Sequence, residues 1–256
     1  MISHKKPKVV NGHRPAYHIM SAQVFDMTDY DIRMTLKKIK RAIIPVGSLE
    51  QHGAHLPVST DSLIAEYISR ILAEKIGAFV LPVISYGVSF EHKPMFNVSL
   101  HNSTLSSMLS DACISLAENH IREIIIVNGH HGNTGVLQYI PQELERRKIP
   151  VRHVKIHTMN YWQLMTPEFD HAGEVETSLV LAIAPELVHM DRAMPNSKNI
   201  TKSQAAYRSL TNVPGSFPKI TGNGVWGDPT KASTSKGDRL IKEITANLAK
   251  TVSELS

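Results

Sequence analysis

The chain has 256 residues, of which 42% are hydrophobic, and it carries a formal net charge of +5. This size and apolar content suffice for one sizeable core and exclude the disordered and collagen-like classes. No apolar run approaches the ~18 residues that a membrane helix needs, and the positive charge is too small and too dispersed to indicate nucleic-acid binding. We therefore expect a soluble protein with neither a membrane nor a nucleic-acid partner.

Two features of the composition bear on location and chemistry. The single cysteine, Cys113, excludes an intrachain disulfide, and the lysine-rich N-terminus lacks the apolar core of a secretory signal. We therefore expect a reducing, cytoplasmic location. The 14 histidines are about twice the number that ordinary composition gives, and they direct attention to metal ligands and proton carriers.

Short apolar runs alternate along the chain with longer amphipathic segments, a pattern typical of parallel βαβ units. The expected elements, in chain order, are a strand at Ala42–Val46, a helix at Ser62–Ile76, a strand at Phe79–Ile84, a helix at Thr104–Asn119, a strand at Glu123–Val127, a helix at Thr134–Arg147, a strand at Val151–Ile156, a helix from near Val175 to before Pro185, and a last helix at Gly237–Leu255. Residues 185–231 are expected to form long surface loops. The pattern predicts an N-terminal tail at residues 1–20 and a single α/β domain at residues 21–256.

Polar side chains gather where the predicted strands end, which is where open α/β sheets bind their ligands. Glu50 and His52 follow the first strand and lie two residues apart, so in an extended segment their side chains point the same way. Asp61 stands at the start of the next helix, and His130 follows the third strand. Carboxylate oxygen and imidazole nitrogen are the ligands that suit zinc, manganese or ferrous iron. These segments therefore predict a metal site.

A further carboxylate is expected from the segment that follows the fourth strand, in which Glu174 and Glu176 both begin a predicted helix. Either acid would also be favoured there by the helix dipole without any metal. His171, in the same segment, is a candidate proton carrier because imidazole titrates near neutral pH. A helix-end histidine bonded to a carbonyl is the alternative reading.

Two of these segments read GSLEQHGAHLPVSTD, from Gly47 to Asp61, and NGHHGN, from Asn128 to Asn133. They resemble the corresponding motifs of the creatininase (creatinine amidohydrolase) family, and the similarity runs from about residue 44 to residue 237. The resemblance implies a creatininase-like three-layer α/β/α sandwich on a mainly parallel sheet. It also implies a binuclear site for two divalent metal ions (Zn, Mn or Fe) and a homo-oligomer, a hexamer.

The resemblance also assigns ligands. It gives Glu50, Asp61 and His130 to one ion, and His52 with the shared Asp61 to the other. Creatininase takes a further carboxylate ligand two residues after its loop histidine, where this chain has Gly132. Glu176 is the expected substitute, with Glu174 as the alternative.

The implied reaction is attack of metal-activated water on an amide carbon, with His171 and Glu176 as catalytic residues. His131, His92 and Trp162 are candidate substrate-binding residues. A solvated loop is the alternative reading for His92, an exposed loop position for His131, and an ordinary core or interface position for Trp162.

The predicted function is hydrolysis of a non-peptide C–N bond, in a cyclic amide or a formamide, of a small molecule. The mild positive charge, with Lys93 and Lys231 in predicted loops, favours an anionic substrate. Two alternatives stay open. One is a formamidopyrimidine-nucleotide deformylase of archaeal riboflavin or deazaflavin biosynthesis, and the other is a non-catalytic protein that binds a metal or a small molecule.

Overall fold

A computed structural model of the protein describes residues 22–146, 153–197 and 213–255. Its centre is a parallel five-stranded sheet with the order β1-β3-β2-β4-β5. The strands are β1 (Ala22–Gln23), β2 (Arg41–Val46), β3 (Phe79–Val80), β4 (Glu123–Asn128) and β5 (Lys155–Asn160). The central strands β2 and β4 pair along their full lengths, so their carboxyl ends lie side by side.

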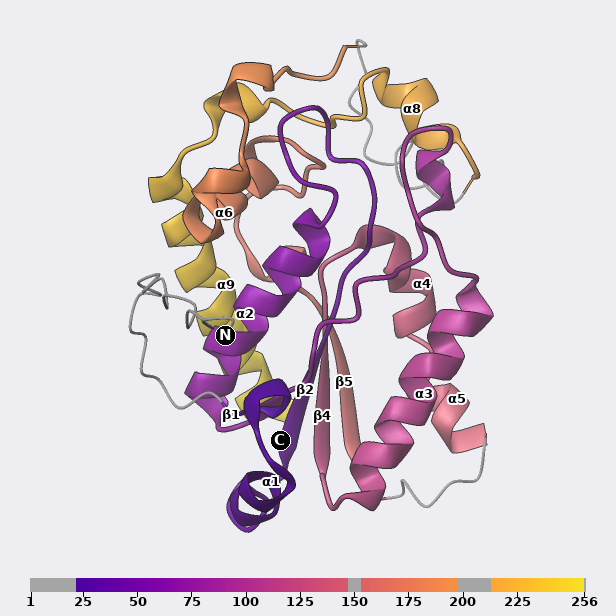
Figure 1. The fold of residues 1–256 in the computed structure, drawn as a ribbon, viewed down its shortest axis with the longest axis vertical. Coiled ribbons are helices and arrows are strands. Elements are labelled where there is room, and N and C mark those ends of the chain that lie inside the picture. Colours follow the sequence, from indigo (N-terminus) through magenta and orange to yellow (C-terminus); the bar gives the residue numbers. More distant parts are fainter. Residues whose placement is uncertain (1–21, 147–152, 198–212, 256) are drawn as a thin grey trace, which may run out of the picture.

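Helices cover both faces of the sheet (Figure 1). One layer contains α2 (Thr60–Ile76), α6 (Glu174–Ile183) and α9 (Thr234–Leu255), and the other contains α3 (Asn102–Glu118), α4 (Thr134–Leu137) and α5 (Ile140–Arg146). Two short helices, α1 (Asp29–Thr35) and α8 (Ser216–Thr221), lie outside these layers. The predicted three-layer α/β/α sandwich is confirmed.

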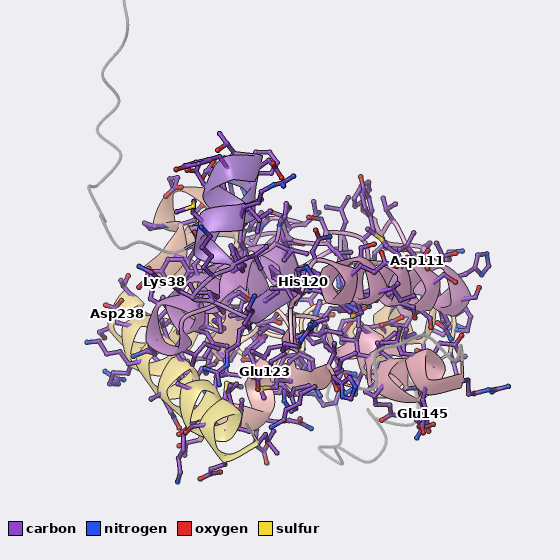
Figure 2. All side chains as sticks on the ribbon, turned by 90° about the horizontal axis from the view of Figure 1, so that it is seen from below. Lys38, Asp111, His120, Glu123, Glu145 and Asp238 are labelled. Atoms are coloured by element: carbon purple, nitrogen blue, oxygen red, sulfur yellow. The ribbon has the colours of Figure 1, made fainter. Side chains whose placement is uncertain are left out.

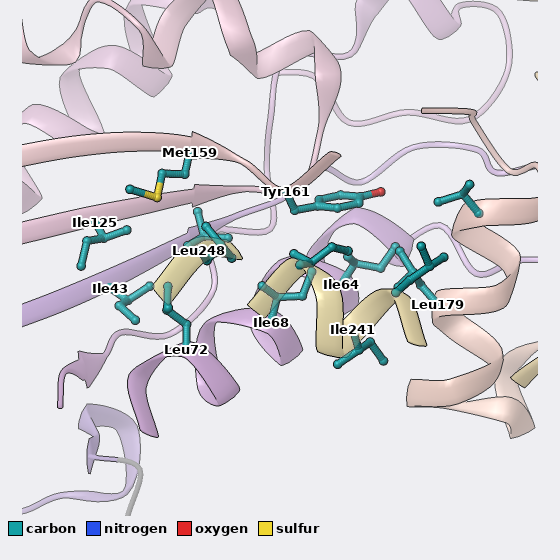
Figure 3. Close-up of a cluster of buried hydrophobic side chains, with 14 of the residues drawn as sticks. Ile43, Ile64, Ile68, Leu72, Ile125, Met159, Tyr161, Leu179, Ile241 and Leu248 are labelled. Carbon is teal, nitrogen blue, oxygen red and sulfur yellow. The ribbon is translucent and has the colours of Figure 1, made fainter. Parts of the chain in front are cut away.

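Alternate residues of the central strands face opposite helical layers, because successive side chains of a strand point to opposite faces. Ile43 and Ile125 join the core beneath α2, α6 and α9, where they pack with Leu72 (Figure 3). Ile44 and Ile126 join the core beneath α3, α4 and α5. Both faces are therefore apolar, which explains why these strands read as continuous hydrophobic runs.

Two strands differ from their predicted bounds. β3 ends at Val80 rather than at residue 84. The Leu81 N–H still donates to the Ile43 carbonyl, and beyond Pro82, a residue that is unfavourable inside a sheet, the chain pairs with β2 again at a bridge between Ile84 and Val46. β5 starts at Lys155, later than predicted. It is an edge strand with polar side chains, so its sequence lacks the apolar run of β2 and β4.

The helix predicted at residues 134–147 is two helices, α4 and α5. Pro141 has no N–H, and its ring would collide with the Leu137 carbonyl in a continuous helix. The predicted loop region contains α8, and β1 and α1 were not predicted. The predicted tail, residues 1–20, lies outside the described residues.

The two ends of the sheet differ in chemistry. Figure 2 shows the molecule from below, the side of the amino end of the sheet, where Glu123 begins β4. The loops after β2 and β4, which carry the polar motifs, lie at the opposite end. None of the described helices is both long enough and apolar enough to cross a membrane.

Candidate metal centre

The first cluster of potential ligands consists of Glu50, Asp61 and His130. Glu50 lies in the loop after β2, Asp61 in the first turn of α2, and His130 directly after β4. His130 Nδ1 is 3.2 Å from Asp61 Oδ2, and His130 Nε2 is 3.2 Å from Glu50 Oε2. All three side chains are buried. The structure thus brings together three residues that the family resemblance assigned to one ion.

The second cluster consists of His52, Asp61 and Glu176. His52 Nε2 lies 3.1 Å from Asp61 Oδ1 and 3.6 Å from Glu176 Oε2. Asp61 therefore presents one oxygen to His52 and the other to His130. Glu176 is in this cluster, whereas Glu174 forms an ion pair with Lys236 at 2.6 Å.

Two glycines allow the strand ends to pack tightly against the first turn of α2. A Cβ atom on Gly47 would lie 2.5 Å from the backbone nitrogen of Ser62, and one on Gly129 would lie 2.3 Å from the carbonyl oxygen of Asp61. Only glycine permits these approaches. They bring the loops after β2 and β4 to the same carboxylate, that of Asp61.

Hydrogen bonds fix the orientation of the ligand side chains. His52 Nδ1 is 3.1 Å from the carbonyl oxygen of Glu50, and donation there leaves Nε2 free to act as a ligand. Ser48 Oγ donates to Glu50 Oε2 at 3.0 Å, and the backbone N–H of Ala172 donates to Glu176 Oε2 at 2.6 Å. This is the supporting arrangement that metal-binding histidines and carboxylates require.

Two buried oxygens of the clusters lack a hydrogen bond of suitable geometry: Glu50 Oε1, which lies 3.0 Å from His92 Nε2, and Asp61 Oδ2, which lies 3.2 Å from His130 Nδ1. Leaving a buried carboxylate oxygen without a partner costs free energy unless a cation lies beside it. The carboxylate and imidazole donors are those that zinc, manganese and iron prefer. The residues present therefore fit divalent metal ions.

The electrostatics of the clusters agree with this fit. Burial by itself would lower the pKa of His52, but Asp61, Glu176 and Glu50 together raise it to about 10. Burial raises the pKa of Glu176 to about 8. Protons on His52 and His130, whose pKa values are both raised by the carboxylates, thus offset the negative charge in the metal-free protein, and a divalent ion would replace those protons.

Comparison with known proteins identifies the family. The model of the family described as creatinine amidohydrolase matches residues 25–252. The chain belongs to the creatininase family. It is 28% identical to "Creatinine amidohydrolase" of Pseudomonas putida, over 83% of this chain and 88% of the relative. It is 29% identical to "Mycofactocin precursor peptide peptidase" of Mycolicibacterium smegmatis, over 90% of this chain and 91% of the relative.

The fold agrees with that of solved creatininases. The structure described as "Creatininase Mn" superimposes with a TM-score of 0.79 and 26% identity, covering 91% of this chain and 98% of that one. This creatininase-family member therefore shares the sandwich over nearly its whole length.

In this family member, two further histidines predicted as site residues lie against the clusters. His171 Nδ1 is 3.9 Å from Glu50 Oε1, and its Nε2 is 3.1 Å from the carbonyl oxygen of Gln51. Burial and the neighbouring His52 and His92 lower the pKa of His171 well below its usual range. His92 is also buried, with Nε2 3.0 Å from Glu50 Oε1, so the alternative of a solvated loop is wrong.

Two neighbouring cavities share part of their walls, and the inner one lies at the clusters. The inner one has a volume of only about 10 Å³ and is lined by Asp61, Glu91, His92, His130, His131, Phe169, His171, Glu176 and Phe217. The outer groove has a volume of about 540 Å³, and its walls include His131, Trp162, Phe169 and Trp226. His131 and Phe169 line both, so the groove adjoins the inner cavity. The predicted substrate-binding residues His131 and Trp162 lie on this groove.

Glu91 and Tyr161 lie at the clusters but were not among the predicted site residues. Glu91 is 4% exposed and lies in the 3₁₀ turn Phe90–His92 after β3, and burial raises its pKa to about 7. The Tyr161 hydroxyl donates to Glu176 Oε1 at 3.5 Å. Tyr161 directly follows β5, and that position at a strand end was a usable signal.

Proposed function

We propose that this protein is a binuclear metal-dependent amidohydrolase that cleaves an amide C–N bond of a small molecule with water. The observation that carries the proposal is the position of Asp61, with one carboxylate oxygen toward His52 and the other toward His130. One ion would be held by Glu50, Asp61 and His130, and the other by His52, Asp61 and Glu176. Bound divalent ions lower the pKa of water toward ~7 and polarise a carbonyl.

Zinc, manganese and iron are the proposed ions. Solved creatininases are described as "Creatininase Mn" and as "Zn-Zn type", which supports the first two. A homohexamer and a cytoplasmic location are further proposals, which rest on the family and on the single cysteine.

The chain supplies its own groups for proton transfer and positioning. Donation from His171 Nε2 to the Gln51 carbonyl leaves Nδ1 as the basic nitrogen, directed toward Glu50. We assign His171 the uptake of a proton from the attacking water at Nδ1 and its transfer to the departing nitrogen. The Tyr161 hydroxyl and the Ala172 N–H hold the Glu176 carboxylate in place.

The cavities favour a substrate whose reactive amide lies at one end. The inner cavity has room for about one water molecule in addition to the side chains, so the body of a substrate must occupy the outer groove. The aromatic side chains of Trp162, Phe169 and Trp226 fit a planar or apolar group there. A peptide amide is included in this proposal, because a relative described as a peptidase aligns over 90% of the chain.

The positions of Lys93 and Lys231 do not support the anionic substrate that these lysines suggested in the sequence. Lys93 is exposed beside Pro94 and Lys219, and Lys231 pairs with Asp228 at 3.3 Å. Neither lysine lines the inner cavity or the groove, whose walls carry the acid Glu168. The nucleotide deformylase is likewise less favoured, since a relative of that name aligns over only 55% of the chain.

The test of the proposed function is metal content together with amide hydrolysis. We expect purified protein loaded with zinc or manganese to hold about two ions per chain by elemental analysis. It should release amine or carboxylate product from one of a panel of creatinine, formamidopyrimidine nucleotide and short peptides. A chelator should abolish turnover and either metal should restore it. Protein that binds no metal would refute the proposal and favour a non-catalytic binding protein.

His171→Ala should separate proton transfer from metal binding. We expect the variant to retain its metal ions and to lose turnover by about 10²–10⁴-fold, the usual contribution of a general acid or base. Elemental analysis and steady-state kinetics measure the two effects. Unchanged turnover would remove His171 from the mechanism, and loss of one ion would make it a ligand, since it also lies near Glu50 and His52.

A further inference from the structure

Glu91 is a buried carboxylate beside the first cluster that the assignment above leaves unused. Its Oε1 lies 3.7 Å from His130 Nε2 and 4.0 Å from His92 Nε2, both longer than a hydrogen bond. The side chain is 4% exposed and lines the inner cavity. A carboxylate so placed, without a close cation, is costly to bury.

The position of Glu91 depends on Gly132, a residue without a side chain in the loop after β4. A Cβ atom on Gly132 would lie 2.7 Å from Glu91 Oε1, 2.4 Å from His130 Nε2 and 2.3 Å from the carbonyl oxygen of Val88. Residue 132 therefore cannot carry a side chain without displacing backbone. The space beside His130 is filled instead by a carboxylate from the turn after β3.

Glu91 and Glu50 approach the same nitrogen of His130, at 3.7 and 3.2 Å, and the carbonyl oxygen of Val88 lies 2.9 Å from that nitrogen. Two oxygens of this group, Glu50 Oε1 and Asp61 Oδ2, are buried and lack a hydrogen bond of suitable geometry, although imidazole nitrogens lie 3.0 and 3.2 Å from them. With Glu91 the site contains four carboxylates, whose combined charge balances two divalent ions.

We infer that Glu91 is an additional ligand of the ion held by Glu50, Asp61 and His130. The inference rests on the proposed binuclear site and adds to it a carboxylate from a different loop. In this chain, ligands of the first ion thus come from four segments: the loop after β2, the start of α2, the turn after β3 and the loop after β4.

The test compares Glu91→Gln with Glu118→Gln, an exposed acid at the end of α3, as the matched control. Elemental analysis and zinc titration against a competing chelator measure stoichiometry and affinity. We expect Glu91→Gln to bind one of its two zinc ions at least about 100-fold more weakly, since even side chains that only support a ligand contribute 10–100-fold. The control should bind both ions as the unaltered protein does.

The outcomes distinguish this inference from the proposed function. If Glu91→Gln binds both zinc ions with unchanged affinity, Glu91 is not a ligand and the binuclear site stands. If the unaltered protein binds no zinc, both fail. Cobalt-loaded protein gives a second measurement, because its visible absorption changes with ligand number. Should Glu91→Gln not fold, Glu91→Asp is measured in this way, and a spectrum identical to that of the unaltered protein would overturn the inference.

Discussion

Asp61→Asn is expected to abolish the paired metal site. Asparagine keeps the size of the side chain but removes the charge that serves both His52 and His130. In the variant, the two clusters therefore no longer have an anionic ligand in common. We expect metal content to fall to one ion or fewer per chain and turnover to fall by about 10³-fold or more, which corresponds to roughly 4 kcal/mol.

The control for this variant is Asp238→Asn, an exposed position on α9 outside both cavities. It changes the net charge equally and should leave metal content and turnover as they are. Metal content by elemental analysis, turnover of whichever panel substrate is hydrolysed, and circular dichroism are measured on both variants. Two ions retained by folded Asp61→Asn would show that Asp61 is not a shared ligand.

Most of the candidate metal ligands could be predicted from the sequence because they lie within short motifs at strand ends. Glu50, His52 and Asp61 occur within 12 residues of one another, and His130 follows a strand that is fully buried. Parallel strands bring such segments to one edge of the sheet, so their proximity follows from the topology alone.

Glu91 was not predicted as a ligand. It comes from a short turn without a motif, and its burial depends on α8, more than a hundred residues later in the chain. The Gly215 N–H donates to the Phe90 carbonyl at 3.2 Å, and the Phe217 ring lies 4.6 Å from that of His92. Long-range packing of this kind leaves no periodic signal in the sequence.

The fold was predicted where hydrophobic periodicity is strong and missed where it is weak. The helices α2 and α3 and the buried strands β2 and β4 agree with their predicted ranges to within two residues. The edge strands β1 and β5, in contrast, were not predicted at their observed positions. β1 has two residues, and β5 has one partner strand and partly exposed side chains, so neither needs a run of apolar residues.

Ile64→Ala is expected to have the largest effect on stability. Ile64 lies on α2, is fully buried, and packs in the core between the sheet and the helices α2, α6 and α9 (Figure 3). Removing its branched side chain from a closely packed core leaves a cavity, so we expect the free energy of unfolding to fall by about 2–5 kcal/mol. Ile64→Val should cost only ~0.5–1.5 kcal/mol, because one methyl group is lost.

Urea denaturation in the presence of a chelator measures this effect without the stabilisation that bound metal adds. Met108→Ala, at a 48% exposed position on α3, is the control and should change the free energy of unfolding by no more than about 0.5 kcal/mol. A loss for Ile64→Ala as small as that of the control would contradict the packing described here.

The same variant also tests whether core and metal centre are independent. Ile64 lies one turn after Asp61 on α2, but the first turn of that helix is held by the close approaches of Gly47 and Gly129. The cavity opens on the core side of the helix, away from these contacts. We therefore expect folded Ile64→Ala to bind zinc with the affinity of the unaltered protein. A weaker affinity would show that core packing positions Asp61.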